Sequence, residues 1–145
     1  MTCWWALLTK YARQRLILGG KHMKQLLIAA HGSRRESSND ELKALVAKVS
    51  ANLGVAFAGV ELAFLEFASP SIESVLVDFF NGKTTEVVVL PYFLSAGNHV
   101  VQDIPREIHK VLDQWPDKKI TVLPHIGALD AMANVIVEAC KNDNH

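Results

Sequence analysis

Hydrophobic and polar positions divide the chain into short apolar runs and longer amphipathic stretches. The apolar runs are long enough for a buried strand and too short for a helix, and they occupy residues 25–30, 60–65, 86–90 and 120–123. Three consecutive valines in the third run favour a sheet covered on both faces, and Pro91, which cannot donate to a ladder, is expected to end it. The pattern predicts four buried strands.

The stretches after these runs carry apolar residues at helical spacing. Ser38-Asn39-Asp40-Glu41 fits a capping box ahead of the first stretch, and Gly54 is expected to close it. Ser69-Pro70 fits a cap and first-turn proline ahead of the second. The four predicted helix faces are Leu42, Leu45, Val46, Val49 and Leu53; Ile72, Val75, Leu76, Phe79 and Phe80; Ile104, Ile108, Val111, Leu112 and Trp115; and Leu129, Met132, Val135, Ile136 and Cys140.

The resulting order of elements is β-α-β-α-β-α-β-α. Right-handed crossovers between successive strands then give an α/β fold with a four-stranded parallel sheet and helices on both faces. The sequence shows no repeat and no low-complexity linker that would divide residues 23–145. We therefore expect these residues to form one domain.

Composition narrows the class of protein further. Half of the residues are hydrophobic and the mean hydropathy is +0.15, which is too apolar for disorder. No apolar run approaches the roughly 20 residues of a membrane-spanning helix. The 15 basic and 15 acidic residues balance, and the basic ones are scattered, so neither nucleic acid nor an anionic membrane is expected as a partner. The composition predicts a soluble globular protein.

Residues 1–22 differ from the rest of the chain. They carry four basic and no acidic residues, so residues 23–145 hold 11 basic against 15 acidic ones. Trp4, Leu8 and Tyr11 would share a helix face, which is one way to build a membrane-surface anchor. We favour a leader that is disordered or loosely packed, with Met23 as the true start. The domain then keeps only Cys140, which fits a reducing cytoplasm.

Four chemically active side chains follow the four predicted strands. His31 and Glu66 come directly after the first and second strands, His125 follows the fourth strand after Pro124, and His99 lies in the loop after the third. Parallel strands end at one edge of the sheet, so these residues are expected there together. Glu66 lies in an apolar stretch, where a buried carboxylate needs a partner or a function.

These donors suit a labile divalent metal ion. Imidazole and carboxylate ligands match cobalt, iron(II), nickel or zinc without choosing among them, and they also accept protons near neutral pH. The motifs of nucleotide-binding and serine-hydrolase sites are absent from the sequence. The sequence has no nucleotide-binding G-x-x-x-x-G-K-[ST] or G-x-G-x-x-G, and no G-x-S-x-G turn of a serine hydrolase.

Three sequence blocks around these residues resemble the CbiX-type small sirohydrochlorin chelatases. They appear in the family's order, and the resemblance covers residues 23–140. The blocks are AAHGSR at residues 29–34, AFLEFASPSI at residues 63–72, and VLPYFLSAGNH at residues 89–99 with DIP at residues 103–105.

The resemblance implies a single chelatase-like lobe that works as a homodimer. His31 and His99 would bind the incoming metal and help remove pyrrole protons, with Glu66 as ligand or base. The implied reaction inserts Co²⁺, or alternatively Fe²⁺ or Ni²⁺, into sirohydrochlorin for cobalamin or siroheme, with no organic cofactor. A metal- or tetrapyrrole-binding protein without turnover is the alternative.

The macrocycle carries several carboxylates, so cationic and polar groups near His31 and His99 are candidates to hold it. A solvated loop explains Arg34 and Arg35 equally well, and the family usually has an apolar residue where this chain has His125. The candidate substrate-binding residues are Ser33, Arg34, Arg35, Tyr92, Ser95, Asn98 and His125.

Overall fold

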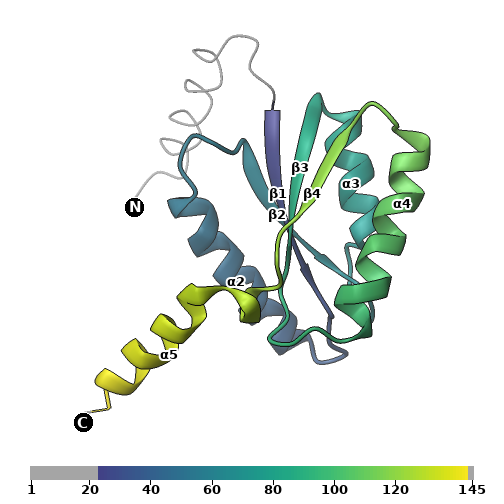
Figure 1. Cartoon of the computed structure of the whole chain (residues 1–145). Helices are drawn as coiled ribbons and strands as arrows, with labels where there is room; N and C mark the ends of the chain where they lie inside the picture. Colours follow the sequence, from purple (N-terminus) through teal and green to yellow (C-terminus); the bar gives the residue numbers. More distant parts are fainter. Residues whose placement is uncertain (1–22, 144–145) are drawn as a thin grey trace.

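The four predicted strands form one parallel sheet in the computed structural model, which describes residues 23–143. The expected leader, residues 1–22, lies outside the described residues. The sheet has the order β2-β1-β3-β4, so the first strand of the domain lies inside it (Figure 1). The strands are β1 (Met23–Ala30), β2 (Gly59–Phe64), β3 (Thr84–Pro91) and β4 (Lys119–Val122).

The central strands alternate their side chains between two buried faces. Val87 and Val89 point to one face and Val88 to the other, and all three are at most 5% exposed. This explains the continuous valine run. β3 includes Pro91, one residue beyond the expected end, because a proline at the last position removes no ladder donor inside the strand. Pairing continues through the Tyr92 N–H, which donates to the Ala29 carbonyl at 2.7 Å.

Helices cover both faces of the sheet, as predicted. The helices are α2 (Glu36–Asn52), α3 (Ile72–Asn81), α4 (Ile104–Gln114) and α5 (Asp130–Lys141), with a π-helix η1 (His99–Asp103) before α4 and a 3₁₀ turn η2 (Ile126–Ala128) before α5. α3 and α4 pack on one face, and α2 packs on the other (Figure 1). The larger core lies on the α3–α4 face and includes Leu27, Val87, Val89, Ile72, Leu76, Ile104 and Val111.

The expected capping box at Ser38 is wrong. α2 begins at Glu36, after Arg35, whose side chain makes no cap hydrogen bond. Asn39, in the middle of the expected box, is 1% exposed, and its side-chain amide accepts from the Ser33 N–H and donates to the Ser33 carbonyl. Asn39 therefore holds the loop that follows β1, a role that local spacing does not reveal.

The predicted cap of α3 is also displaced. Ser71, and not Ser69, precedes the helix, and its hydroxyl accepts from the Ser74 N–H at 3.2 Å. The Ser69–Pro70 peptide bond is cis and lies before this cap. The helix ends at Asn81, and the N–H of the C-cap residue Gly82 donates to the Asp78 carbonyl.

The last predicted helix forms but does not cover the sheet. No residue of α5 is buried, and the helix extends away from the sheet in Figure 1. Among residues 23–143, no helix combines the length and apolar character needed to cross a membrane.

Two glycines adopt backbone conformations that other residues avoid. Gly54 has φ +74° and open space where a Cβ would be, whereas Gly32 has φ +94° and a Cβ there would lie 1.9 Å from the Glu66 carbonyl oxygen. Gly32 therefore allows the segments after β1 and β2 to touch, in addition to supplying a left-handed residue.

We expect Gly32→Ala to lower the free energy of unfolding by at least about 1 kcal/mol more than Gly54→Ala does. Both substitutions incur the left-handed penalty of about 1–2 kcal/mol, but only the first also forces atoms into a filled space. Urea unfolding followed by circular dichroism measures both, with Gly54→Ala as the matched control. Equal losses would show that the contact with Glu66 is not tight.

Candidate metal-binding site

Three of the four side chains expected at the carboxyl edge of the sheet converge in the structure. His31 follows β1 directly, Glu66 lies two residues beyond β2, and His99 begins η1 after the loop that follows β3. One ligand atom from each lies within 4.8 Å of the others. We call these three residues the triad. His125, which follows β4, is outside this group of ligand atoms.

Backbone pairing beyond the ends of β1 and β2 positions the first two members. The Leu65 N–H donates to the Ala30 carbonyl, and the Glu66 N–H donates to the His31 carbonyl, both at 2.9 Å. Together with the close approach of Gly32, these bonds hold the two segments side by side. The His31 Nε2 and Glu66 Oε2 atoms are 3.6 Å apart as a result.

The expectation that Glu66 lies in apolar surroundings is wrong. Its side chain is 49% exposed, in the bends that follow β2. The carboxylate therefore does not bear the cost of burial, and it is accessible to a ligand that arrives from solvent.

The hydrogen bonds of both histidines leave the same ring nitrogen available. His31 Nδ1 lies 3.0 Å from the Gly32 carbonyl oxygen, and His99 Nδ1 lies 2.7 Å from Asp103 Oδ2. A carbonyl oxygen and a carboxylate oxygen only accept, so each Nδ1 carries the proton and donates. In the neutral rings both Nε2 atoms then keep their lone pairs, which is the tautomer a metal ligand needs.

Asp103 is part of a short chain of charged groups. It lies four residues after His99 in the π-helical segment, and its other oxygen pairs with Arg106 on the next turn. The guanidinium of Arg106 therefore adds a second charged contact to the carboxylate that bonds His99. The π-helix, a rare element that is frequent at functional sites, places the Nδ1 atom of His99 against Asp103.

Aromatic rings surround the two imidazoles. The His31 and His99 rings meet edge to face, with centroids 4.5 Å apart, and the Phe93 ring stacks over His99 at 6.4 Å. These contacts restrict the rotation of both imidazoles.

Phe67 adds an exposed aromatic surface beside the triad. Its backbone has φ +60°, and its side chain is 51% exposed although it is large and apolar. The ring lies 5.7 Å from the His31 ring, and the Arg34 guanidinium sits 4.7 Å over its centroid. A strained backbone that presents an apolar ring to solvent is typical of a residue kept for a ligand contact.

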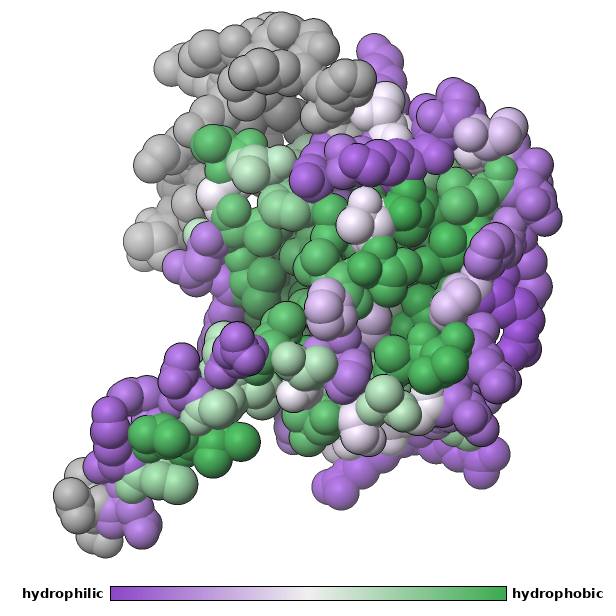
Figure 2. All heavy atoms as spheres, viewed as in Figure 1, coloured by the Kyte–Doolittle hydropathy of each residue, from purple (hydrophilic) through white to green (hydrophobic). Residues whose placement is uncertain are grey.

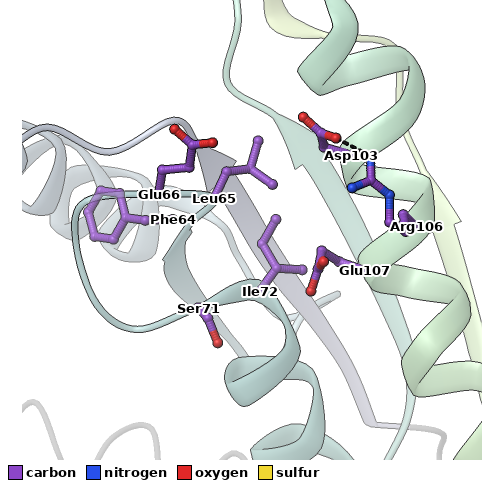
Figure 3. A pocket seen from close by; sticks show the side chains of 8 residues that line it. All are labelled: Phe64, Leu65, Glu66, Ser71, Ile72, Asp103, Arg106 and Glu107. Carbon is purple, nitrogen blue, oxygen red and sulfur yellow. Dashed lines mark hydrogen bonds and ion pairs between the residues drawn. The ribbon is translucent and has the colours of Figure 1, made fainter.

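A pocket adjoins the triad between the end of β2 and the start of α4 (Figure 3). Its volume is about 220 Å³, and Figure 3 shows Asp103, Arg106 and Glu107 facing Glu66 and the apolar side chains of the β2–α3 segment. The full lining is Phe64, Leu65, Glu66, Ser71, Ile72, Asp103, Arg106 and Glu107. Five of the eight lining residues are polar or charged, so the cavity is suited to a polar ligand group.

The other predicted substrate-binding residues occupy several environments. Arg34 is exposed over Phe67, while the Nε–H of Arg35 donates to the Ser37 hydroxyl. Tyr92 packs against the core on the α2 face of the sheet. The remaining three are Ser33, held by Asn39, and Ser95 and Asn98, both exposed in the loop before η1.

Sequence reasoning missed Asp103 and Phe67 as site residues. Asp103 has a readable signal, since a residue four positions after His99 shares its face of a helix. Phe67 has none, because its positive φ and its exposure arise from the turn after β2.

Comparison with known proteins identifies the family. The family model described as CbiX matches residues 25–143. A sirohydrochlorin ferrochelatase of Priestia megaterium is 29% identical over 123 residues, covering 85% of this chain and 46% of that protein. A sirohydrochlorin cobaltochelatase of Sulfurisphaera tokodaii is 29% identical over 117 residues, covering 80% of this chain and 90% of that protein.

A solved structure shares the fold. The cobalt complex of the sirohydrochlorin chelatase SirB from Bacillus subtilis superposes with a TM-score of 0.74 at 26% identity, over 83% of this chain and 51% of that one. The chain spans about half the length of the curated ferrochelatases it matches. The family match extends over nearly the whole described domain and includes all three triad residues, so the chain belongs to the CbiX family.

Proposed function

We propose that this protein inserts a divalent metal ion, cobalt or alternatively iron, into sirohydrochlorin. The observation that carries the proposal is the triad, in which two histidines with free Nε2 atoms and one accessible carboxylate converge. The relatives named above are sirohydrochlorin chelatases for iron or cobalt, which supports this substrate pair. The metal is a substrate in this reaction, and the proposal includes no organic cofactor.

The proposed mechanism uses the triad first as ligand and then as base. The His31 and His99 Nε2 atoms and a Glu66 oxygen hold the ion at the rim. Sirohydrochlorin then approaches, and its nitrogen atoms replace the protein ligands one by one. The macrocycle must release two N–H protons for each divalent ion that it accepts. Each protein ligand that dissociates from the ion has a free lone pair again, which can accept a proton. The same side chains therefore take up the protons that the ring loses.

Phe67 and Arg34 are proposed to hold the macrocycle. The exposed Phe67 ring lies next to His31, where it offers an apolar surface to a flat ring system. Arg34 above it supplies a cation for a peripheral carboxylate. Ser33, Arg35, Tyr92, Ser95, Asn98 and His125 remain proposed contacts with the substrate.

We further propose a cytoplasmic homodimer in which residues 23–145 form each functional lobe. One lobe offers a single rim of ligands, whereas two lobes related by a twofold axis would enclose a planar macrocycle. The ferrochelatase relatives are about twice as long as the region that this chain matches, which supports a need for two lobes.

Loss of either triad histidine should abolish the reaction. We expect His31→Ala and His99→Ala each to slow cobalt insertion by more than about 100-fold, beyond the range typical of residues that only orient a ligand. The absorbance change of sirohydrochlorin on metallation measures the rate. His109→Ala is the matched control, since His109 is exposed on α4, where its ring bonds the Pro105 carbonyl and lies outside the triad. Full activity in both triad variants would refute the mechanism, and tight binding without acceleration by the native protein would favour the non-catalytic alternative.

Asp103 should act by positioning His99. We expect Asp103→Asn to weaken Co²⁺ binding by about 10- to 100-fold, because the amide can donate to Nδ1 and so move the proton to Nε2. Isothermal titration measures the affinity, and the visible spectrum of bound Co²⁺ reports the loss of an imidazole ligand. Glu138→Gln, which removes a carboxylate on α5 that pairs with Lys141, is the control and should leave both unchanged. An Asp103→Asn variant with native affinity and spectrum would show that His99 needs no such partner.

A further inference from the structure

α5 carries an apolar face of which no residue is buried by the part of the chain that the structure describes. The face is centred on Ile136 and also contains Leu129, Met132, Ala133, Ala139 and Cys140. Ile136 is 60% exposed, and Val135 and Val137 at its flanks are 57% and 52% exposed. The opposite face is polar and includes Asn134 and a Glu138–Lys141 ion pair at 2.8 Å. A helix with this pattern is stable only when its apolar side packs against something.

One face of the sheet is only partly covered by the described helices, and we call its uncovered part the gap. α3 and α4 pack on one side, but among residues 23–143 only α2 packs on the other, where it lies over β2. On that second face Val88 of β3 is buried, at 5% exposed, and no described helix packs over β4. Leu123 there is 38% exposed, and Leu45 on the flank of α2 is equally exposed. Figure 2 shows apolar residues gathered in the centre of the visible face of the molecule and again on α5.

α5 is short enough to lie along the strands that border the gap. The 12 residues of α5 make a rod about 18 Å long. β3 has 8 residues and spans about 26 Å, which is longer than the helix. Among the described residues, the second face of the sheet thus has room for a further helix, and α5 is a helix that packs on no sheet.

The connection before α5 directs the helix away from its own sheet. The Gly127 N–H in η2 donates to the Phe93 carbonyl at 3.0 Å, and a Cβ on Gly127 would lie 1.9 Å from the Leu94 carbonyl oxygen. η2 is therefore fixed against the loop after β3. Leu129 alone, in an extended conformation, separates η2 from α5, so the start of the helix is anchored where it points outward.

We propose that α5 of each protomer packs on the β3–β4 face of a second copy of this chain. Each copy then gives one helix and receives one, so the contact is reciprocal and closes with twofold symmetry. This inference rests on the homodimer proposed above and specifies the surface that holds it together. A second copy fits as the occupant because it supplies the same spare helix and the same gap.

A charge on the apolar face should separate the protomers. We expect Ile136→Lys to raise the dimer dissociation constant by at least about 10-fold, since an ammonium group buried in the contact lacks a partner. Sedimentation velocity of the full chain measures it. Asn134→Lys adds the same charge on the opposite face and should leave the dimer intact. Both positions are exposed, so neither variant is expected to disturb the fold, which circular dichroism verifies. A dimer that survives Ile136→Lys unchanged would overturn the proposal.

A photo-crosslink identifies the occupant of the gap. With benzoylphenylalanine in place of Ile136, irradiation of the full chain should give a covalent dimer whose crosslinked peptide contains β3 or β4. The same residue in place of Asn134 should give none. A crosslink within one chain would mean that α5 folds back on its own sheet, and a crosslink to residues 1–22 would mean that this segment covers the helix. Either result refutes the exchange.

The insertion assay keeps this failure separate from failure of the proposed function. A native chain that inserts cobalt and dimerises without α5 contradicts only the exchange. A native chain that shows the α5 crosslink but does not accelerate insertion contradicts only the proposed activity. A strict monomer at micromolar concentration contradicts both the homodimer and the exchange.

Discussion

The site depends on the parallel pairing of β1 with a strand on each side. In the sequence, a helix separates β1 from β2 and another separates β2 from β3. Pairing with β1 nevertheless brings the carboxyl ends of all three strands to one edge of the sheet. The β1–β2 pairing continues into the turns, where the backbones of His31 and Glu66 bond each other and Gly32 permits the contact. The rigid sheet thus determines the separation of the two groups, while their side chains remain open to solvent.

The second constraint is the choice of ring nitrogen. A backbone carbonyl fixes the proton of His31, and a carboxylate fixes that of His99. Such partners hold an imidazole in one tautomer and orientation before any metal arrives. In the function we propose, this arrangement readies the triad for a divalent ion, and its partly exposed side chains suit a metal that enters from solution and leaves in a product.

Much of the fold could be predicted because apolar runs and helical periodicity depend on local sequence. The rule that parallel strands end at one edge of the sheet also predicted that His31, Glu66 and His99 lie together, because it needs only the order of strands and helices. The start of α2 could not be predicted, since the side chain of Asn39 bonds the backbone of Ser33 six residues earlier, outside the spacing of a capping box. Periodicity showed that α5 has an apolar face but not what covers it. The exposure of Glu66 and the position of Phe67 follow from a turn whose backbone angles the residue types do not disclose.

The account's central claim is that the triad binds the metal through the Nε2 atoms that its hydrogen bonds leave free. The most direct test is a crystal structure of the full chain with Co²⁺, read from the anomalous signal of the metal. We predict one ion bound by Nε2 of His31, Nε2 of His99 and an oxygen of Glu66, with both Nδ1 atoms still bonded to their present partners. An ion held through Nδ1, or bound away from these three residues, would contradict the account.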